Sequence, residues 1–212
     1  LAAWAALSQD PEFSDRLCSL LVEEGCGTIS HSGSVVVRAL ELTTRYVTNR
    51  AMKGAAQLAR DGEVSSACQV VRAVLDSPVD EHIGESSLTP IIQVGDSLAE
   101  QIEAAASGFT WKTENPPSEC LSLSLLAAAV GERHPCTKTW MNAIRESNSR
   151  LVTRWINRAV EYANDDNDYR RAYNLLDKGK SLTVTEEVSE RLRRNMVTVR
   201  EAADERILRV EL

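Results

Sequence analysis

The segment RYVTNRAMKGAAQLARDGEVSSACQVV, residues 45–71, has a counterpart 105 residues later, RLVTRWINRAVEYANDDNDYRRAYNLL, residues 150–176. The two segments align without a gap. The same offset pairs identical residues outside them, among them Pro11 with Pro116, Glu41 with Glu146 and Ile102 with Ile207. A shared apolar period does not explain matches of proline, threonine and aspartate. The sequence therefore predicts a tandem duplication, with homologous units of about 105 residues at 1–105 and 106–212.

Capping and breaking residues divide each predicted unit into four helices. In the first unit we expect helices from Pro11 to Glu24, from Ser32 or Ser34 to the Asp61-Gly62 turn, from Glu63 onward, and from Ser87 to Ala106. In the second unit we expect them from Pro116-Pro117 to Gly131, from Thr137 to Ala163, from Asp168 onward, and from Thr185 onward. The long helix of the first unit carries a predicted buried stripe at Val35, Val36, Ala39, Leu40, Tyr46, Val47, Met52, Ala55 and Ala59.

A long helix, a short polar turn and a shorter helix form an αα-hairpin. One such hairpin cannot bury its apolar face alone, so repeats of this kind stack on one another. We therefore expect an all-α protein of two tandem four-helix units, arranged as a short α-solenoid or as a pair of helical bundles. Trp140 and Trp155 are expected in the core, because large aromatic residues on apolar faces are usually packing residues.

The composition narrows the functional classes. The 212 residues are 43% hydrophobic and 5% aromatic, and their formal net charge is −7. No basic domain is present, so we expect no nucleic-acid partner, and no apolar run is long enough to span a membrane. Five cysteines without a CxxC pair indicate reduced thiols, which predicts an intracellular, cytoplasmic protein. The chain opens on Leu1, and we expect it to be a segment of a larger protein.

Two hairpins, Gly54 to Val74 and Ala159 to Gly179, resemble a tetratricopeptide repeat. The residues that carry the resemblance are Trp155, Ala159, Tyr162, Asp168, Tyr169, Ala172 and Leu176. The second hairpin departs from the family pattern because its turn, Asn164 to Asn167, is one residue longer and Gly179 stands where the family prefers alanine. The first hairpin also looks like helical regions that accompany von Willebrand A domains. Both resemblances imply adaptor or accessory roles rather than catalysis.

Three motifs suggest chemistry at first sight. Gly179-Lys180-Ser181 lacks the preceding glycine and the strand of a phosphate loop, so a helix C-terminus is the favoured interpretation. The Asn164 to Asp168 run lacks the glycine and glutamate of a calcium loop, which favours a solvated turn. His134-Pro135-Cys136, with Cys120 nearby in sequence, lacks a second ligand pair for zinc, and a loop is favoured. We therefore expect no catalytic residues, no metal and no cofactor.

The candidate binding residues lie on the two long helices. Arg45, Asn49 and Lys53 recur at four-residue intervals and share a helix face, and the offset of 105 places Arg150, Arg154 and Arg158 at the same positions. Two such stripes could hold an acidic peptide by charge-assisted hydrogen bonds. The alternative is two solvated helix faces whose cations pair with Glu41, Glu146 and Glu161.

These observations predict a non-catalytic protein–protein interaction scaffold or adaptor. A partner peptide or helix, acidic in character, would bind in a groove between the repeat helices. The alternative function is a regulatory helical module that acts on an enzyme or a von Willebrand A-type domain elsewhere in the same chain. The sequence does not define the oligomeric state.

Overall fold

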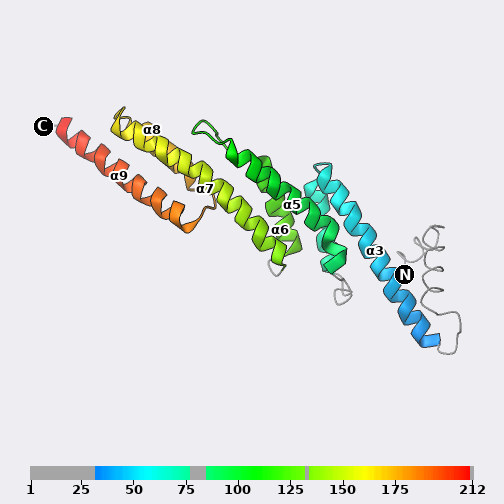
Figure 1. Cartoon of the computed structure of the whole chain (residues 1–212). Coiled ribbons are helices and arrows are strands. Elements are labelled where there is room, and N and C mark those ends of the chain that lie inside the picture. Colours follow the sequence, from blue (N-terminus) through cyan, green and yellow to red (C-terminus); the bar gives the residue numbers. More distant parts are fainter. Residues whose placement is uncertain (1–31, 77–84, 132–133, 211–212) are drawn as a thin grey trace. The chain divides into compact units, whose positions relative to one another are not determined.

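The described part of the chain is all-helical. The computed structural model describes residues 32–76, 85–131 and 134–210. Every regular element in these ranges is a helix, which confirms the all-α class (Figure 1). The helices are α3 (Ser32–Arg60), α4 (Val64–Leu75), α5 (Glu85–Ser107), α6 (Ser118–Val130), α7 (Pro135–Asn164), α8 (Tyr169–Gly179) and α9 (Glu186–Val210).

These helices lie within a few residues of the predicted positions. The predicted helix from Pro11 to Glu24 lies outside the described residues. The largest differences at a helix start are two residues, in α5, which begins at Glu85 rather than at Ser87, and in α7, which begins at Pro135 rather than at Thr137. In α7 the reason is local: proline suits the first turn of a helix, and Nδ1 of His134 accepts the N–H of Cys136 at 3.3 Å.

The chain divides into two compact units, Leu1–Ile91 and Ile92–Leu212, with the division inside α5. The repeat boundary at residue 105 stays a prediction, because a division by compactness does not measure homology. Of the helices in the described ranges, none has the length and apolar character that a membrane crossing requires.

In the first unit, α3 packs against α4. Asp61 to Glu63 join them in a Schellman turn, in which Glu63 donates to the carbonyl of Leu58 at 2.8 Å and Gly62 to that of Ala59 at 3.2 Å. Gly62 has a φ of +87°, which favours glycine. The buried apolar residues of the hairpin are mostly small: Met52, Ala55, Ala56, Ala59, Val64, Ala67, Cys68 and Val71.

The predicted stripe on α3 is confirmed at Met52, Ala55 and Ala59 and is wrong at Val47. Val47 is 37% exposed, whereas the adjacent Thr48 is buried. Thr48, Met52, Ala55 and Ala59 follow one another at intervals of three or four residues, so they define the buried face and Val47 lies beside it. The side chains of Val35, Val36, Ala39 and Leu40 lie outside the described set.

In the second unit, α7 is the central helix. It packs against α6, α8 and α9, and α9 also packs against α8 (Figure 1). The core around it contains Ala106, Phe109, Leu151, Val152, Trp155, Ile156, Ala159, Ala172, Leu176, Leu192, Met196 and Val199. Trp140 and Trp155 are both buried, which confirms their prediction as core residues. The Trp140 indole fills the space beside Gly95 and donates to Oδ1 of Asp96 at 2.9 Å.

A polar contact fixes the start of α9 on α7. Asn148 donates through Nδ2 to the carbonyl of Thr183 at 3.0 Å. Oγ of Ser149 accepts the N–H of Thr185 at 2.8 Å. Both side chains are buried, where an unmade hydrogen bond is costly, so the segment before α9 is held in one position on α7.

Candidate functional site

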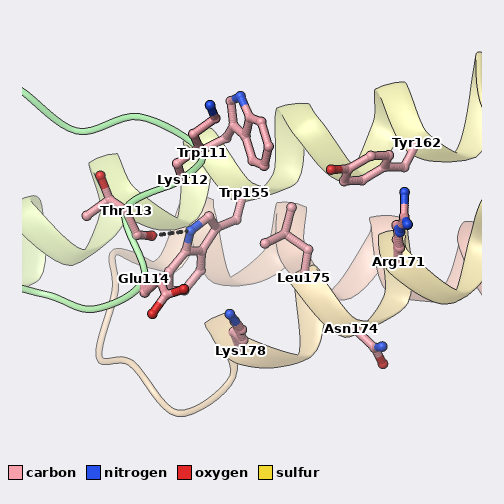
Figure 2. Close-up of a pocket in the computed structure, with 10 residues that line it drawn as sticks. All are labelled: Trp111, Lys112, Thr113, Glu114, Trp155, Tyr162, Arg171, Asn174, Leu175 and Lys178. Carbon is pink, nitrogen blue, oxygen red and sulfur yellow. Dashed lines mark hydrogen bonds between the residues drawn. The ribbon is translucent and has the colours of Figure 1, made fainter.

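The loop between α5 and α6 displays an aromatic side chain beside α7. Phe109 is buried in the core, and the carbonyl of Thr113 accepts the Trp155 Nε1–H at 3.0 Å (Figure 2). Between these anchors, Thr113 donates its N–H to the carbonyl of Thr110 at 3.1 Å and closes a turn. Trp111 lies inside this turn and is 41% exposed. An exposed tryptophan on a loop fixed at both sides presents a rigid apolar surface to solvent.

Arg158 of α7 connects Trp111 to Tyr162. Its guanidinium carbon lies 5.0 Å from the centre of the Trp111 ring and 4.1 Å from that of Tyr162. The two rings lie edge to face, with centres 6.4 Å apart. Nη1 of Arg158 also pairs with Oε2 of Glu161 at 2.7 Å, and this hydrogen bond raises the pKa of Arg158 above its ordinary value. The Arg158 guanidinium thus contacts both rings by cation–π interactions and links the loop to α7.

Next to this cluster is an open hollow of about 470 Å³, which we call the Trp155 hollow. Its lining comes from three elements: Trp111, Lys112, Thr113 and Glu114 from the loop, Trp155 and Tyr162 from α7, and Arg171, Asn174, Leu175 and Lys178 from α8 (Figure 2). Aromatic and aliphatic groups meet three cations and one carboxylate there. The volume and mixed lining are typical of a binding site.

Two more hollows adjoin α7, one beside the same stretch as the Trp155 hollow and one nearer the N-terminus of the helix. The central hollow, about 410 Å³, is lined by Phe109, Thr110, Trp111, Arg154, Asn157, Arg158 and Glu161. The α9 hollow, about 610 Å³, is lined by Ala106, Ser107, Glu146, Ser149, Arg150, Thr153, Arg154, Thr185, Glu187, Val188 and Arg191. The central hollow shares Trp111 with the Trp155 hollow and Arg154 with the α9 hollow. We call this row of three hollows the α7 groove.

The predicted residues Arg150, Arg154 and Arg158 all line the α7 groove. Arg150 and Arg154 are exposed, and within the described residues neither forms an ion pair with a carboxylate. Arg158 is partly buried and does pair with Glu161, as the alternative of a solvated, ion-paired face predicts. Arg191 of α9 adds a further cation and donates to Oδ1 of Asn157 at 2.7 Å.

The predicted residues Arg45, Asn49 and Lys53 belong to α3, in the other unit. All three are exposed and follow one another at four-residue intervals on one helix face. Their binding role stays a prediction, and so does the groove that they would share with Arg150, Arg154 and Arg158.

The Gly179-Lys180-Ser181 motif forms a helix C-terminus, as predicted. Gly179 is the last residue of α8, and Lys180 follows it as the C-cap. Nζ of Lys180 lies 2.9 Å from Oδ1 of Asp177, and this contact raises the pKa of Lys180. The motif is therefore part of the α8 terminus rather than a loop between a strand and a helix.

The Asn164 to Asp168 run starts at the last residue of α7 and forms the turn to α8, also as predicted. Asn167 has a φ of 52°, and Oδ1 of Asp168 caps α8 by accepting the N–H of Arg171 at 3.0 Å. In the part of the chain that the structure describes, no three His, Cys, Asp or Glu side chains are grouped to hold a metal ion.

His134 and Cys136 meet at the start of α7. Nδ1 of His134 lies 2.9 Å from Sγ of Cys136, so this segment is a helix cap and not the loop that we expected. Burial raises the pKa of Cys136, and also that of Cys120. Reactive cysteines have a lowered pKa, so both groups are protonated thiols at neutral pH.

Sequence reasoning missed the loop and the α8 side of the groove. Gly108 follows the last residue of α5, and Trp111 and Lys112 lie just after it. An aromatic residue next to a cation in a loop was the sequence signal that could have indicated this part of the site. On α8, Arg171, Asn174, Leu175 and Lys178 have the spacing of one helix face. The sequence shows that spacing, but it does not show that this face of α8 lies beside the loop.

Comparison of the chain with models of known protein families, with curated proteins and with solved structures gave no match.

Proposed function

We propose that this chain is a non-catalytic protein–protein interaction scaffold and that the α7 groove binds a segment of a partner protein. Arg150, Arg154 and Arg158 are the cationic contacts of that groove. We propose the same role for Arg45, Asn49 and Lys53 on the surface of α3. The two surfaces belong to different units, and each contacts a partner protein independently of the other.

The observation that carries this proposal is the state of Arg150 and Arg154. Both are exposed, both line hollows, and within the described residues both lack an acidic partner, although the chain carries an excess of acidic residues. Exposed cations in such a chain commonly pair along the helix, as Arg193 and Arg194 do with Glu190. Unpaired arginines beside an exposed tryptophan are typical of interaction surfaces.

The test is affinity purification from cell extract with the 212-residue chain as bait. The variant R150E/R154E reverses two exposed charges of the groove, and K138E reverses an exposed charge of α7 outside its lining. We expect partners that the wild-type chain and K138E retain and that R150E/R154E loses. Partners that all three baits retain equally would contradict a role for this groove. A bait that retains no partner would contradict the scaffold function.

The α3 surface is tested in the same experiment with R45E/K53E. Because both residues are exposed, this variant should keep its helical circular dichroism spectrum. Loss of a partner in R45E/K53E alone would place that contact on α3. Identical partners for this variant and the wild type would remove α3 from the proposal and leave the α7 groove.

A further inference from the structure

We propose that the α7 groove recognises a linear acidic peptide with two separated contacts. Acidic residues of the peptide bind Arg150 and Arg154 at the α9 hollow, and one large apolar side chain enters the Trp155 hollow. This inference rests on the proposed function and specifies the chemistry of the partner segment.

The acidic contact follows from the charges in the α9 hollow. Arg150 and Arg154 are one helical turn apart on α7, and Arg191 reaches the same hollow from α9. Each guanidinium can bind a carboxylate through two hydrogen bonds. Glu146 and Glu187 also line the hollow, so its three cations exceed its acids by one. This small excess fits a singly charged carboxylate better than a phosphate dianion.

The apolar contact follows from the Trp155 hollow. Trp155 is almost fully buried and its Nε1–H is bonded to the carbonyl of Thr113, so its indole forms only the apolar floor of the hollow (Figure 2). Leu175 and the ring of Trp111 extend that surface. A large apolar side chain that leaves water here should strengthen binding about tenfold or more.

Cations surround this apolar surface. Lys112, Arg171 and Lys178 line the hollow together with the carboxylate of Glu114, and Arg171 also pairs with Asp168 at 3.2 Å. Lys178 has no ion-pair partner within the described residues. A peptide with acidic residues next to its apolar side chain therefore matches the charge of the hollow as well as its surface.

The helix sets the spacing between the two contacts. The α9 hollow meets α7 from Glu146 to Arg154 and the Trp155 hollow meets it at Trp155 and Tyr162, so the two span a rise of at most about 24 Å at about 1.5 Å per residue. Measured along α7 between the centres of the two linings, the rise is about 12 Å. An extended peptide advances about 3.3 Å per residue. The acidic residues and the apolar residue should therefore be about four to seven positions apart.

The experiment is a selection from a random library of peptides of about twelve residues, displayed on phage, against the immobilised wild-type chain; this length spans about 40 Å when extended. Parallel selections use R150E/R154E, W111A and the control K138E. Trp111 and the three charged positions are exposed, so these variants should fold, and circular dichroism verifies that they do. Enriched peptides are then synthesised and their affinities measured by fluorescence anisotropy.

We expect the wild type and K138E to enrich peptides with acidic residues and a large apolar residue at the predicted spacing. Replacing either group in a selected peptide should weaken its binding about tenfold. R150E/R154E should abolish the acidic preference, and W111A should weaken the apolar one. Raising the salt concentration should weaken the acidic contact, since it lies at the surface.

Three outcomes would overturn the inference: peptides without acidic residues, peptides that bind R150E/R154E as well as the wild type, or no enrichment. Any of them can coexist with a partner that affinity purification shows to depend on Arg150 and Arg154. That combination means that the groove binds a folded partner surface, so the linear peptide is rejected and the scaffold function is kept. If the peptide selection and the affinity purification both fail in this way, both the linear peptide and the scaffold function are rejected.

Discussion

In the α3–α4 hairpin, Asp61 to Glu63 join the two helices, whereas α7 and α8 are joined by the longer segment Asp165 to Asp168. The short helices start 105 residues apart, at Val64 and Tyr169, but the long helices end 104 residues apart, at Arg60 and Asn164. The ungapped alignment of the two hairpins is therefore interrupted by one extra residue in the second turn.

Burial along the long helices follows the same shorter offset. Met52 and Ile156, 104 residues apart, are both fully buried, whereas Asn157, 105 residues after Met52, is exposed. Ala55 and Ala159 are likewise both buried. Along the short helices the offset of 105 holds, since Ala67 and Ala172 are both buried and so are Val71 and Leu176.

This difference shows that sequence identity and structural equivalence can separate by one residue. Val47 and Val152 are identical at the offset of 105, yet they are 37% and 0% exposed. One position along a helix is a rotation of about 100°, which moves a side chain to another face. Stripes aligned at 105 on α3 and α7 therefore do not mark the same face, and each has to be tested in its own unit.

The largest expected effect comes from truncating the buried residues of the long helices. Met52→Ala and Ile156→Ala should each lower the free energy of unfolding of their own unit by about 2–5 kcal/mol, since both remove fully buried side chains. Asn157→Ala should cost less than about 1 kcal/mol, because Asn157 is exposed and loses one hydrogen bond from Arg191. Urea denaturation followed by circular dichroism measures all three. An Asn157→Ala cost equal to that of Ile156→Ala would restore the offset of 105.

The next effect contrasts two glycines. A Cβ at Gly179 would lie 3.1 Å from Cδ2 of Leu192 and 3.2 Å from Cγ1 of Val152, so Gly179→Ala should destabilise the second hairpin by about 1–2 kcal/mol. Gly54 has open space around it inside α3, and Gly54→Ala should stabilise by about 0.5–1 kcal/mol through helix propensity. Thermal unfolding of both variants gives the signs. A stabilising Gly179→Ala would mean that α8 and α9 separate easily.

A smaller effect is expected in the turns, where Gly62 and Asn167 both have positive φ. Gly62→Ala should lower the free energy of unfolding by about 1 kcal/mol, since alanine is strained at this φ. Asn167→Ala should cost somewhat less, and Asn167→Gly should be close to neutral. Equilibrium urea unfolding measures the three values. A neutral Gly62→Ala would show that the Schellman turn can rearrange without loss.

The helix positions were predictable because their signals are local. Asp61-Gly62 ends α3, Pro116-Pro117 precede α6, and Pro135 opens α7. Each acts through its own backbone preferences, which do not depend on distant packing. The offset between the two hairpins was harder to predict from the sequence. Two apolar helix patterns still match approximately when one is shifted by a single residue, so the pattern does not distinguish an offset of 104 from one of 105.

The candidate site was predictable only in part. Exposure of Arg150 and Arg154 follows from their place on the polar face of an amphipathic helix. The contact of Trp111 with Arg158 depends on a loop that returns to α7 from a distant part of the sequence, and the Trp155 hollow needs that loop and α8 together. Such tertiary contacts leave no periodic pattern in the sequence.

A further small effect concerns the caps of the short helices. Asp168 accepts the N–H of Arg171 at the start of α8, whereas Glu63 makes no side-chain cap bond at the start of α4. Asp168→Ala should therefore cost about 1 kcal/mol and Glu63→Ala close to nothing.

The backbone angles of the two residues are similar, with φ −95° and ψ 73° at Asp168 and φ −84° and ψ 53° at Glu63. Glu63→Asp should thus install the missing cap and stabilise the first hairpin by about 0.5–1 kcal/mol. Thermal unfolding of the three variants measures these differences, and a Glu63→Asp variant no more stable than the wild type would show that the two turns differ in more than their length.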